Sequence, residues 1–181
     1  MISETIPRYW ISTVSREHVL VGMEGGFCQV CHGKKGPLAR MKKDDWIIYY
    51  SPKFSMSGTE QCQKFTAIGK IADDTIYQFK MSEGFIPFRR NVTYLKNVQE
   101  QPIRSLLDDL SFTSGKKRWG SSFRLGLFEI PQSDFQLIHE KMVGEAKLCG
   151  KRKPEKEQGS EDIISKKQCF VNIFENIKEK E

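Results

Sequence analysis

A short aromatic and β-branched run near the middle of the chain limits the possible folds most. Residues 46–50 read Trp-Ile-Ile-Tyr-Tyr, and Pro52 follows closely. This composition predicts a strand, and its alternation predicts a sheet that is covered on both faces. Proline has no N–H to donate to a ladder, so the strand is expected to end there. This strand end carries the aromatic ring of Tyr50, the hydroxyl of Ser51 and the cation of Lys53, which together suit a flat polar ligand. An ordinary core strand followed by a turn explains the same residues equally well.

Composition places the chain among globular proteins. Its 181 residues are 38% hydrophobic and 11% aromatic, which allows one sizeable domain and a tail. The formal net charge of +6 favours a polyanionic partner, and most of the excess lies before residue 144. We expect no export signal and no membrane span, and therefore a cytoplasmic protein with reduced thiols.

One short cysteine motif allows several interpretations. Cys28, Cys31 and His32 match the C-x-x-C-H pattern of covalent haem attachment. The same residues could contribute to a zinc site with His18 or Cys62, or to a Cys-His nucleophile. They also fit two half-buried thiols and a loop histidine without chemistry.

The order of the expected elements predicts an α+β fold, a small mixed β-barrel with helices at its rim. We expect strands at 9–14, 46–50, 64–71, 75–81, 85–94 and 125–130. Helices are expected from Ser15, from Pro102 to Leu110 and from Pro131. The three aspartate pairs are expected to be solvated, one of them at a turn between two strands: Asp44-Asp45, Asp73-Asp74, Asp108-Asp109.

Three segments differ in character along the chain. Residues 1–143 are expected to form the folded domain, and residues 144–162 read as a charged linker. Residues 163–181 carry apolar side chains at helical spacing, which predicts an amphipathic helix that packs on the domain or binds a partner.

Basic residues recur beside aromatic residues and glycine turns. Nucleic-acid binding needs cations for phosphates and π faces for bases, and this interleaving supplies both. A solvated surface and separate core aromatics would explain the same residues. The cations concerned are Lys34, Arg89, Arg90, Lys117 and Arg118.

Several ordered segments resemble the EVE domain, a member of the PUA-like superfamily that includes the YTH and ASCH domains. The segments are Tyr9 to Ser12, Lys42 to Lys53, Phe65 to Gly69, Phe88 to Arg90, Leu107 to Phe112, Lys117 to Gly120 and Leu127 to Ile130. The resemblance covers about Arg8 to Val143. It implies a PUA-like barrel with a ligand pocket at one end, and several relatives hold a modified base in an aromatic cage.

We therefore expect a non-catalytic reader of nucleic acid that holds a modified or flipped base and needs no cofactor or metal. RNA and DNA stay open as partners. The resemblance and the pattern together select the base pocket as Ser12, Phe27, Gln29, His32, Tyr50, Ser51, Pro52, Lys53 and Trp119. The five cations named above are expected to bind phosphates.

Two other functions remain open at this point. One is a small hydrolase or transferase acting on a nucleotide-like ligand, with Cys31 or His32 in the chemistry. The other is a protein-interaction module whose contact is the C-terminal helix. The sequence has no P-loop, G-x-G-x-x-G or G-x-S-x-G motif that would support catalysis.

Overall fold

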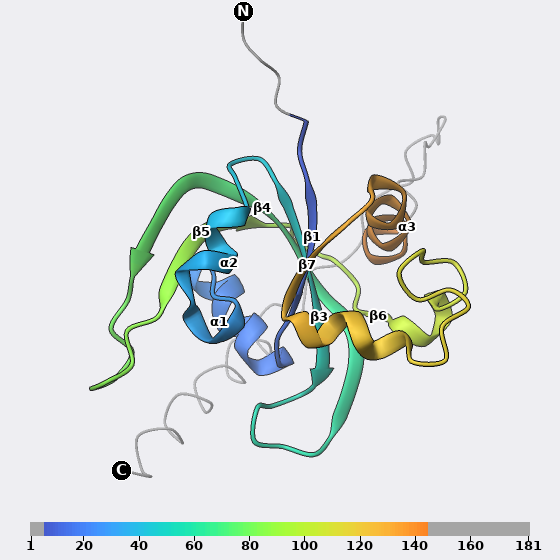
Figure 1. Ribbon diagram of the computed structural model, residues 1–181, viewed down its shortest axis with the longest axis horizontal. Coiled ribbons are helices and arrows are strands. Elements are labelled where there is room, and N and C mark those ends of the chain that lie inside the picture. The colour runs from blue at the N-terminus through green and yellow to red at the C-terminus, as the bar shows by residue number, and fades with distance from the viewer. Residues whose placement is uncertain (1–5, 145–181) are drawn as a thin grey trace, which may run out of the picture. The chain divides into compact units, whose positions relative to one another are not determined.

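The predicted central strand is β3, Trp46–Lys53, in a computed structural model that describes residues 6–144. It runs parallel to β1, Tyr9–Thr13, and antiparallel to β4, Gln61–Gln78 (Figure 1). The predicted C-terminal helix lies outside the described residues, as does the predicted linker beyond residue 144.

Within the described residues, seven strands form one mixed sheet in the order β2-β5-β4-β3-β1-β7, and β6 pairs with β4. This confirms the α+β class. The hydrogen-bonded path ends at β2 and β7, so the sheet is not closed and the predicted barrel is not confirmed. The remaining strands are β2 (Phe27–Cys28), β5 (Phe88–Tyr94), β6 (Gln101–Pro102) and β7 (Leu127–Ile130).

The helices divide between the two faces of the sheet. Figure 1 shows α1 and α2 on one side and α3 on the other. No helix in residues 6–144 combines the length and apolar character needed to cross a membrane. The helices are α1 (Arg16–Gly25), α2 (Lys35–Arg40) and α3 (Gln132–Val143), with 3₁₀ helices η1 (Cys31–Gly33), η2 (Ile103–Leu106) and η3 (Trp119–Leu125).

Three predictions of local structure are wrong. The strand expected to end at Pro52 runs on to Lys53, because Pro52 lies at a register shift between Ser51 and Lys53, where no ladder N–H is required. The helix expected from Pro102 to Leu110 is only the 3₁₀ turn η2, because Pro102 is still paired with Lys64 in the sheet. The expected turn at residues 73–74 is absent, since β4 continues through it with a register shift against β5. A bulge of this kind bends one strand without ending it.

The alternation of β3 is confirmed by two separate hydrophobic cores. Ile48 and Tyr50 enter the core between the sheet and α3, where Phe65 and Phe128 also lie. The core on the α1 and α2 side contains strand side chains in opposite phase, Trp10, Ile47 and Tyr49, together with Leu38 of α2 and Met41 directly after it. Both faces of β3 are therefore buried.

Asp45 joins the start of β3 to the start of β1. Its buried carboxylate accepts hydrogen bonds from the indole N–H of Trp10 at 3.0 Å and from the backbone N–H of Arg8 at 3.0 Å and Lys42 at 2.9 Å. The prediction that this carboxylate is solvated is wrong. A buried carboxylate is stable here because several donors satisfy it.

Arg90 holds α2 against β4 from within β5. Its buried guanidinium donates to the backbone oxygens of Leu38, Met41 and Asp73 and to the carboxylate of Asp74 at 2.9 Å. Its predicted role in binding phosphate is wrong, because these bonds occupy all three guanidinium nitrogens inside the protein. The contacts also satisfy carbonyls that the end of a helix leaves without partners.

We predict that Arg90→Lys lowers the free energy of unfolding by about 2–3 kcal/mol, since an ammonium group cannot reach four acceptors in a plane. Arg118→Lys, on an exposed loop, should change it by less than about 0.5 kcal/mol. Urea unfolding followed by tryptophan fluorescence measures both. Equal midpoints for the two variants would contradict the role given to Arg90.

Candidate functional site

A cavity of about 610 Å³ opens where β1 and β3 end, which is the region where the sequence predicted a ligand. Thr13 from β1 and Pro52 and Lys53 from β3 line it. Its other walls come from α1, residues 29–32, η3 and the β4–β5 hairpin. A volume of this size lies within the roughly 300–1,000 Å³ typical of small-molecule sites.

Four of the residues predicted for the base pocket line this cavity, and five do not. Those that line it are Gln29, His32, Pro52 and Lys53. The other five belong to the cores or to a second layer behind the wall: Ser12, Phe27, Tyr50, Ser51 and Trp119. A cavity therefore lies at the predicted strand end, with only part of the predicted lining, and ligand binding there stays a prediction.

The two predicted residues before Pro52 support the wall instead of forming it. Tyr50 is buried, and its ring centroid lies 4.0 Å from that of Phe123, which lines the cavity. Burial raises the pKa of Tyr50 to about 12, so its hydroxyl stays protonated. The Ser51 hydroxyl is 2.8 Å from that of Thr66 and is also buried.

Phe27 is not available to a ligand. Its ring is buried, and the guanidinium of Arg89 lies 3.7 Å from the ring centroid. α1 packs against the same ring, where a side chain at Gly25 would collide with it. The prediction that Phe27 forms the cage wall is wrong, because an internal cation already occupies its π face.

Arg89 is likewise internal, with 6% of its surface exposed. Its guanidinium lies between the rings of Phe27 and Phe79, at 3.7 and 4.0 Å from their centroids. Its Nε donates to Oε1 of Gln29 at 3.1 Å. The predicted phosphate contact is therefore wrong for Arg89 in this arrangement, and the residue positions the amide of Gln29 instead.

The other predicted phosphate-binding residues are exposed, as that role requires. Lys34 directly follows the turn that lines the cavity, whereas Lys117 and Arg118 lie outside its lining. Trp119 packs edge-on against Phe123 with ring centroids 6.2 Å apart. Contact of Lys34, Lys117 and Arg118 with phosphate stays a prediction.

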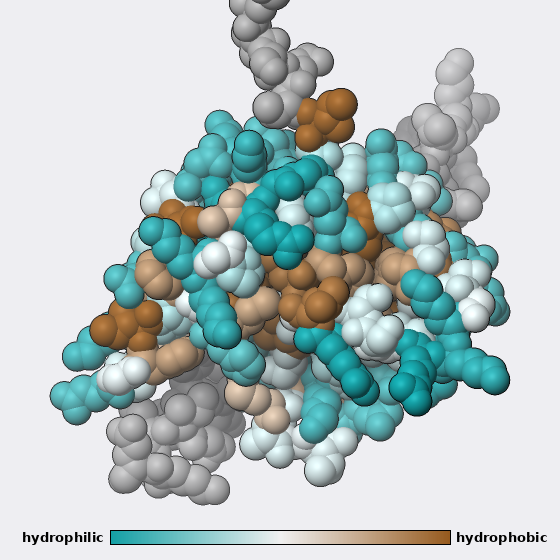
Figure 2. Space-filling view, viewed as in Figure 1, coloured by the Kyte–Doolittle hydropathy of each residue, from teal (hydrophilic) through white to brown (hydrophobic). Residues whose placement is uncertain are grey.

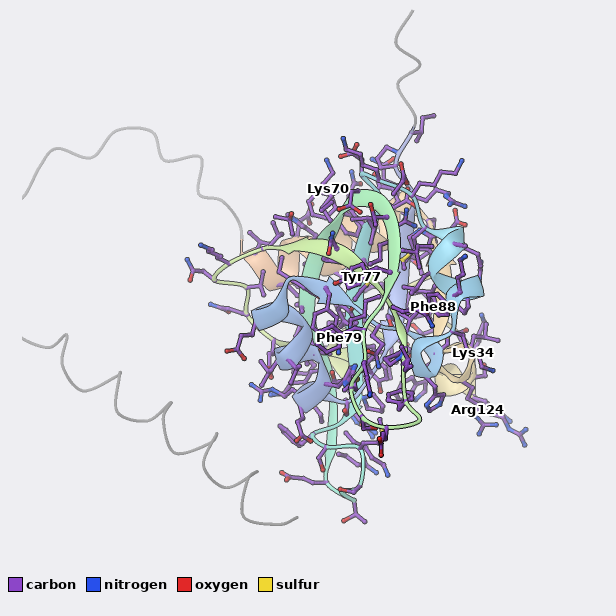
Figure 3. All side chains as sticks on the ribbon, turned by 90° about the vertical axis from the view of Figure 1, so that its left-hand side faces the viewer. Lys34, Lys70, Tyr77, Phe79, Phe88 and Arg124 are labelled. Carbon is purple, nitrogen blue, oxygen red and sulfur yellow. The ribbon has the colours of Figure 1, made fainter. Side chains whose placement is uncertain are left out.

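Several lining residues were not predicted. Thr13 is one position beyond the predicted Ser12, so alternation along β1 explains that error. His18 was singled out in the sequence as a possible zinc ligand and not for the base pocket. Four other lining residues carry no signal in the sequence, because they come from segments far from β3 and from no charged cluster: Met81, Phe85, Phe123 and Arg124. Figure 3 shows Arg124 and Lys34 on the same side of the molecule, with Lys70 at the opposite end of the view.

Two residues of the cavity lining, Thr13 and Gln29, carry polar groups with no hydrogen-bond partner among the described residues. The buried Oγ1 of Thr13 has no hydrogen-bond partner among the described residues. The Gln29 amide oxygen accepts a hydrogen bond from Arg89, which leaves the amide nitrogen of this lining residue as a donor for a ligand. Buried polar atoms without a protein partner are rare in native proteins, and a bound water or ligand usually satisfies them.

The charged groups of the lining have one sign. Lys53 and Arg124 line the cavity, and no carboxylate belongs to its described lining. Neither cation forms an ion pair within residues 6–144. Burial, followed by the positive charge of Arg89, lowers the pKa of His18, so this imidazole is neutral at pH 7. The cavity therefore favours an anionic or neutral polar ligand.

The turn that forms one wall has an unusual backbone. Cys31, His32 and Gly33 have φ values of 48°, 60° and 74°, in the left-handed region. Gly33 is required there because a Cβ would collide with Pro87 of the β4–β5 hairpin. Strained turns of non-glycine residues are typical of functional sites and need support from their surroundings.

The C-x-x-C-H motif is divided between two environments. Cys28 lies in the core, and burial raises its pKa to about 12. The half-buried thiol of Cys31 has a raised pKa for the same reason and lies 3.7 Å from the backbone oxygen of Leu125. No group of three His, Cys, Asp or Glu residues in the described part of the chain could hold a metal ion.

We predict that His18 makes stability depend on pH. The folded protein disfavours the imidazolium form of His18. The stability that neutral His18 contributes is therefore complete above its pKa in the unfolded chain, near 6.5, and is lost as the pH falls through its lower pKa in the folded protein. The free energy of unfolding should therefore decrease from pH 7 to pH 5, and His18→Gln should reduce that decrease. Urea unfolding at pH 7, 6 and 5 measures it; the same decrease in both proteins would contradict the assignment.

Comparison with known proteins identifies the family. Residues 8–141 match the EVE domain. A UPF0310 protein of Streptococcus sanguinis is 51% identical over 135 residues, covering 75% of this chain and 93% of that protein. A UPF0310 protein of Mycolicibacterium vanbaalenii is 49% identical over 134 residues, covering 74% and 92%. A crystal structure of an Agrobacterium tumefaciens protein has 13% identity and a TM-score of 0.47, covering 76% of this chain and 95% of that one. The chain belongs to the EVE domain family.

Proposed function

We propose that this protein binds nucleic acid and holds one base, flipped or modified, in the cavity without acting on it chemically. The observation that carries the proposal is the lining of that cavity. It combines aromatic side chains, an unpartnered hydroxyl and two cations, with no carboxylate among its described members. These are the groups that a base and its neighbouring phosphates need.

The apolar walls suit a flat ring. Phe85 and Phe123 line the cavity, and Met81 adds a polarisable thioether. Stacking of a base on an aromatic side chain contributes about 1–3 kcal/mol and tolerates any base. In this proposal Phe85 and Phe123 stack on the base, in place of Phe27 and Tyr50, which were predicted from the sequence for the base pocket.

The polar groups of the lining suit the edge of a base. Thr13 can donate or accept, the Gln29 amide nitrogen can donate, and the neutral His18 can do either. A base that leaves its stack loses pairing and stacking worth a few kcal/mol, and hydrogen bonds to its edge offset that loss. Discrimination among bases then depends on which of these groups each base can satisfy.

The cations suit the backbone next to that base. Lys53 and Arg124 line the cavity, and Lys34 is exposed beside it. Phosphate contacts orient a nucleic acid and supply most of its non-specific affinity. Membership of the EVE family agrees with this function, because relatives in the PUA-like superfamily include binders of RNA and DNA.

The two alternative functions have less support. The Cys31 thiol has a raised pKa and stays protonated at neutral pH, which is unfavourable for a nucleophile. The proposed interaction module depends on residues 163–181, which lie outside the described residues.

The direct test is binding of the purified protein to fluorescent single- and double-stranded DNA and RNA oligonucleotides at two salt concentrations. Each oligonucleotide is used with and without a modified base. We expect preference for one base or modification. Salt-dependent binding without preference would overturn the base pocket, and no binding would overturn the whole proposal.

We predict that Thr13→Val weakens binding of the preferred oligonucleotide by about tenfold, the value of one hydrogen bond of roughly 1.4 kcal/mol. Stability should not fall, because the hydroxyl has no partner in the free protein. Thr113→Val is the matched control, since the Thr113 hydroxyl donates to the backbone oxygens of Leu107 and Leu110, and none of these residues lines the cavity. It should lower stability and leave the affinity of the folded protein unchanged, and the reverse pattern would contradict the site.

We predict that Arg124→Gln reduces the slope of log affinity against log salt by about 1, the value for one phosphate contact. Lys70→Gln is the control, because Lys70 pairs with Asp44 and lies at the other end of the molecule (Figure 3). Fluorescence anisotropy from 50 to 200 mM salt measures both slopes. Equal slopes for the two variants would exclude Arg124 from the phosphate contacts.

A further inference from the structure

The tip of the β4–β5 hairpin, residues 79–86, carries an unusual density of exposed apolar side chains. Met81 is 45% exposed, Phe85 40% and Ile86 49%, with the Phe79 ring also half exposed. Hydrophobic side chains are visible over this hairpin in Figure 2. No described segment covers them, and an exposed apolar patch marks a contact surface.

This hairpin tip has two apolar faces. The N–H of Met81 bonds to the backbone oxygen of Phe85 at 3.1 Å, so these two residues face each other across the hairpin. Both line the cavity. The pairing of Gln78 with Phe88 continues beyond the strands, because the N–H of Phe79 also bonds to the oxygen of Pro87 at 3.0 Å. Lys80 and Ile86 are the pair between these bonds, so alternation places them on the other face. One face belongs to the cavity and the other is turned away from it.

The base of the hairpin is firmly held. The Arg89 guanidinium stacks between Phe27 and Phe79, and Gly33 lies directly against Pro87. At the tip, Gly84 adopts a φ of 85° between Ser82 and Phe85, which makes the turn narrow. The tip is therefore a thin projection on a rigid base, located at the mouth of the cavity.

We propose that the hairpin tip is an apolar wedge that enters the base stack of a nucleic-acid duplex. Ile86 occupies the gap left by a base, while Met81 and Phe85 contact that base in the cavity. The inference rests on the proposed function and adds to it that the preferred polymer is a duplex.

The chemistry of the wedge follows from base flipping. A base that leaves a duplex opens a gap between its neighbours, and apolar side chains that fill such gaps recover part of the lost stacking. A single strand has no gap to fill, so Ile86 gains nothing there. Lys80 on the wedge face and Lys53 and Arg124 at the cavity carry three positive charges around the tip, against the one carboxylate of Glu83 at its turn. The net positive charge complements the two phosphate backbones.

The test compares two exposed aliphatic residues in the full-length protein. Ile86→Ala shortens the wedge, and Val21→Ala removes a side chain that is 47% exposed on α1. Binding is measured with matched single strands and duplexes of DNA and of RNA, each containing the preferred base. A 2-aminopurine next to that base reports unstacking by its fluorescence.

We expect the unaltered protein to raise 2-aminopurine fluorescence in the duplex. Ile86→Ala should weaken duplex binding by about tenfold or more and reduce the fluorescence increase, with single-strand affinity unchanged within about twofold. Val21→Ala should change neither. The duplex, DNA or RNA, that shows the effect identifies the partner.

Four results would overturn the wedge. Equal loss of single-strand and duplex affinity in Ile86→Ala would make Ile86 an ordinary contact. Unchanged duplex binding, together with loss of a dimer in analytical ultracentrifugation, would assign the tip to self-association. Single-strand binding without duplex binding would remove the wedge but keep the base pocket, whereas no binding to any oligonucleotide would overturn both proposals.

Discussion

The buried guanidinium of Arg90 connects the parts of the structure on which the cavity depends. From β5 it binds the last carbonyls of α2 and the bulged segment of β4, and so holds residues 29–41 beside the β4–β5 hairpin. Its neighbour Arg89 points to the other face of β5 and stacks on Phe27. Two adjacent cations that resemble a phosphate site are thus used for internal structure, because buried cations need acceptors or π faces.

The cavity is formed by groups that the fold supports but leaves incompletely satisfied. The Thr13 hydroxyl has no partner among the described residues, and Cys31 and His32 adopt left-handed backbone conformations. Such features cost free energy and persist because the surrounding contacts are strong. A ligand that bonds to the hydroxyl would recover part of this cost, which links the stability of the frame to selectivity at the site.

Local pattern was sufficient for some features and misleading for others. The aromatic and aliphatic alternation of residues 46–50 correctly predicted a strand buried on both faces, because strand periodicity depends only on neighbouring residues. The same reasoning placed Tyr50 at the ligand, although it packs on Phe123. A register shift between Tyr49 and Tyr50 changes the pairing with β4 at that point, and no residue pattern indicates it. The prediction that Phe27 binds the ligand was wrong for a related reason. The cation that covers its ring, Arg89, is distant from it in sequence.

The order of short motifs along the chain was enough to identify the EVE family, the α+β class and the strand end where a cavity opens. Periodicity, turn residues and motif order are properties of short segments, so they can be read without coordinates. The direction of individual side chains was not available in this way. Whether a cation is buried or exposed, and whether Ser12 or Thr13 reaches the cavity, depends on contacts between residues far apart in the chain. The apolar hairpin tip became recognisable as exposed only when packing had buried every comparable stretch of the sheet around it.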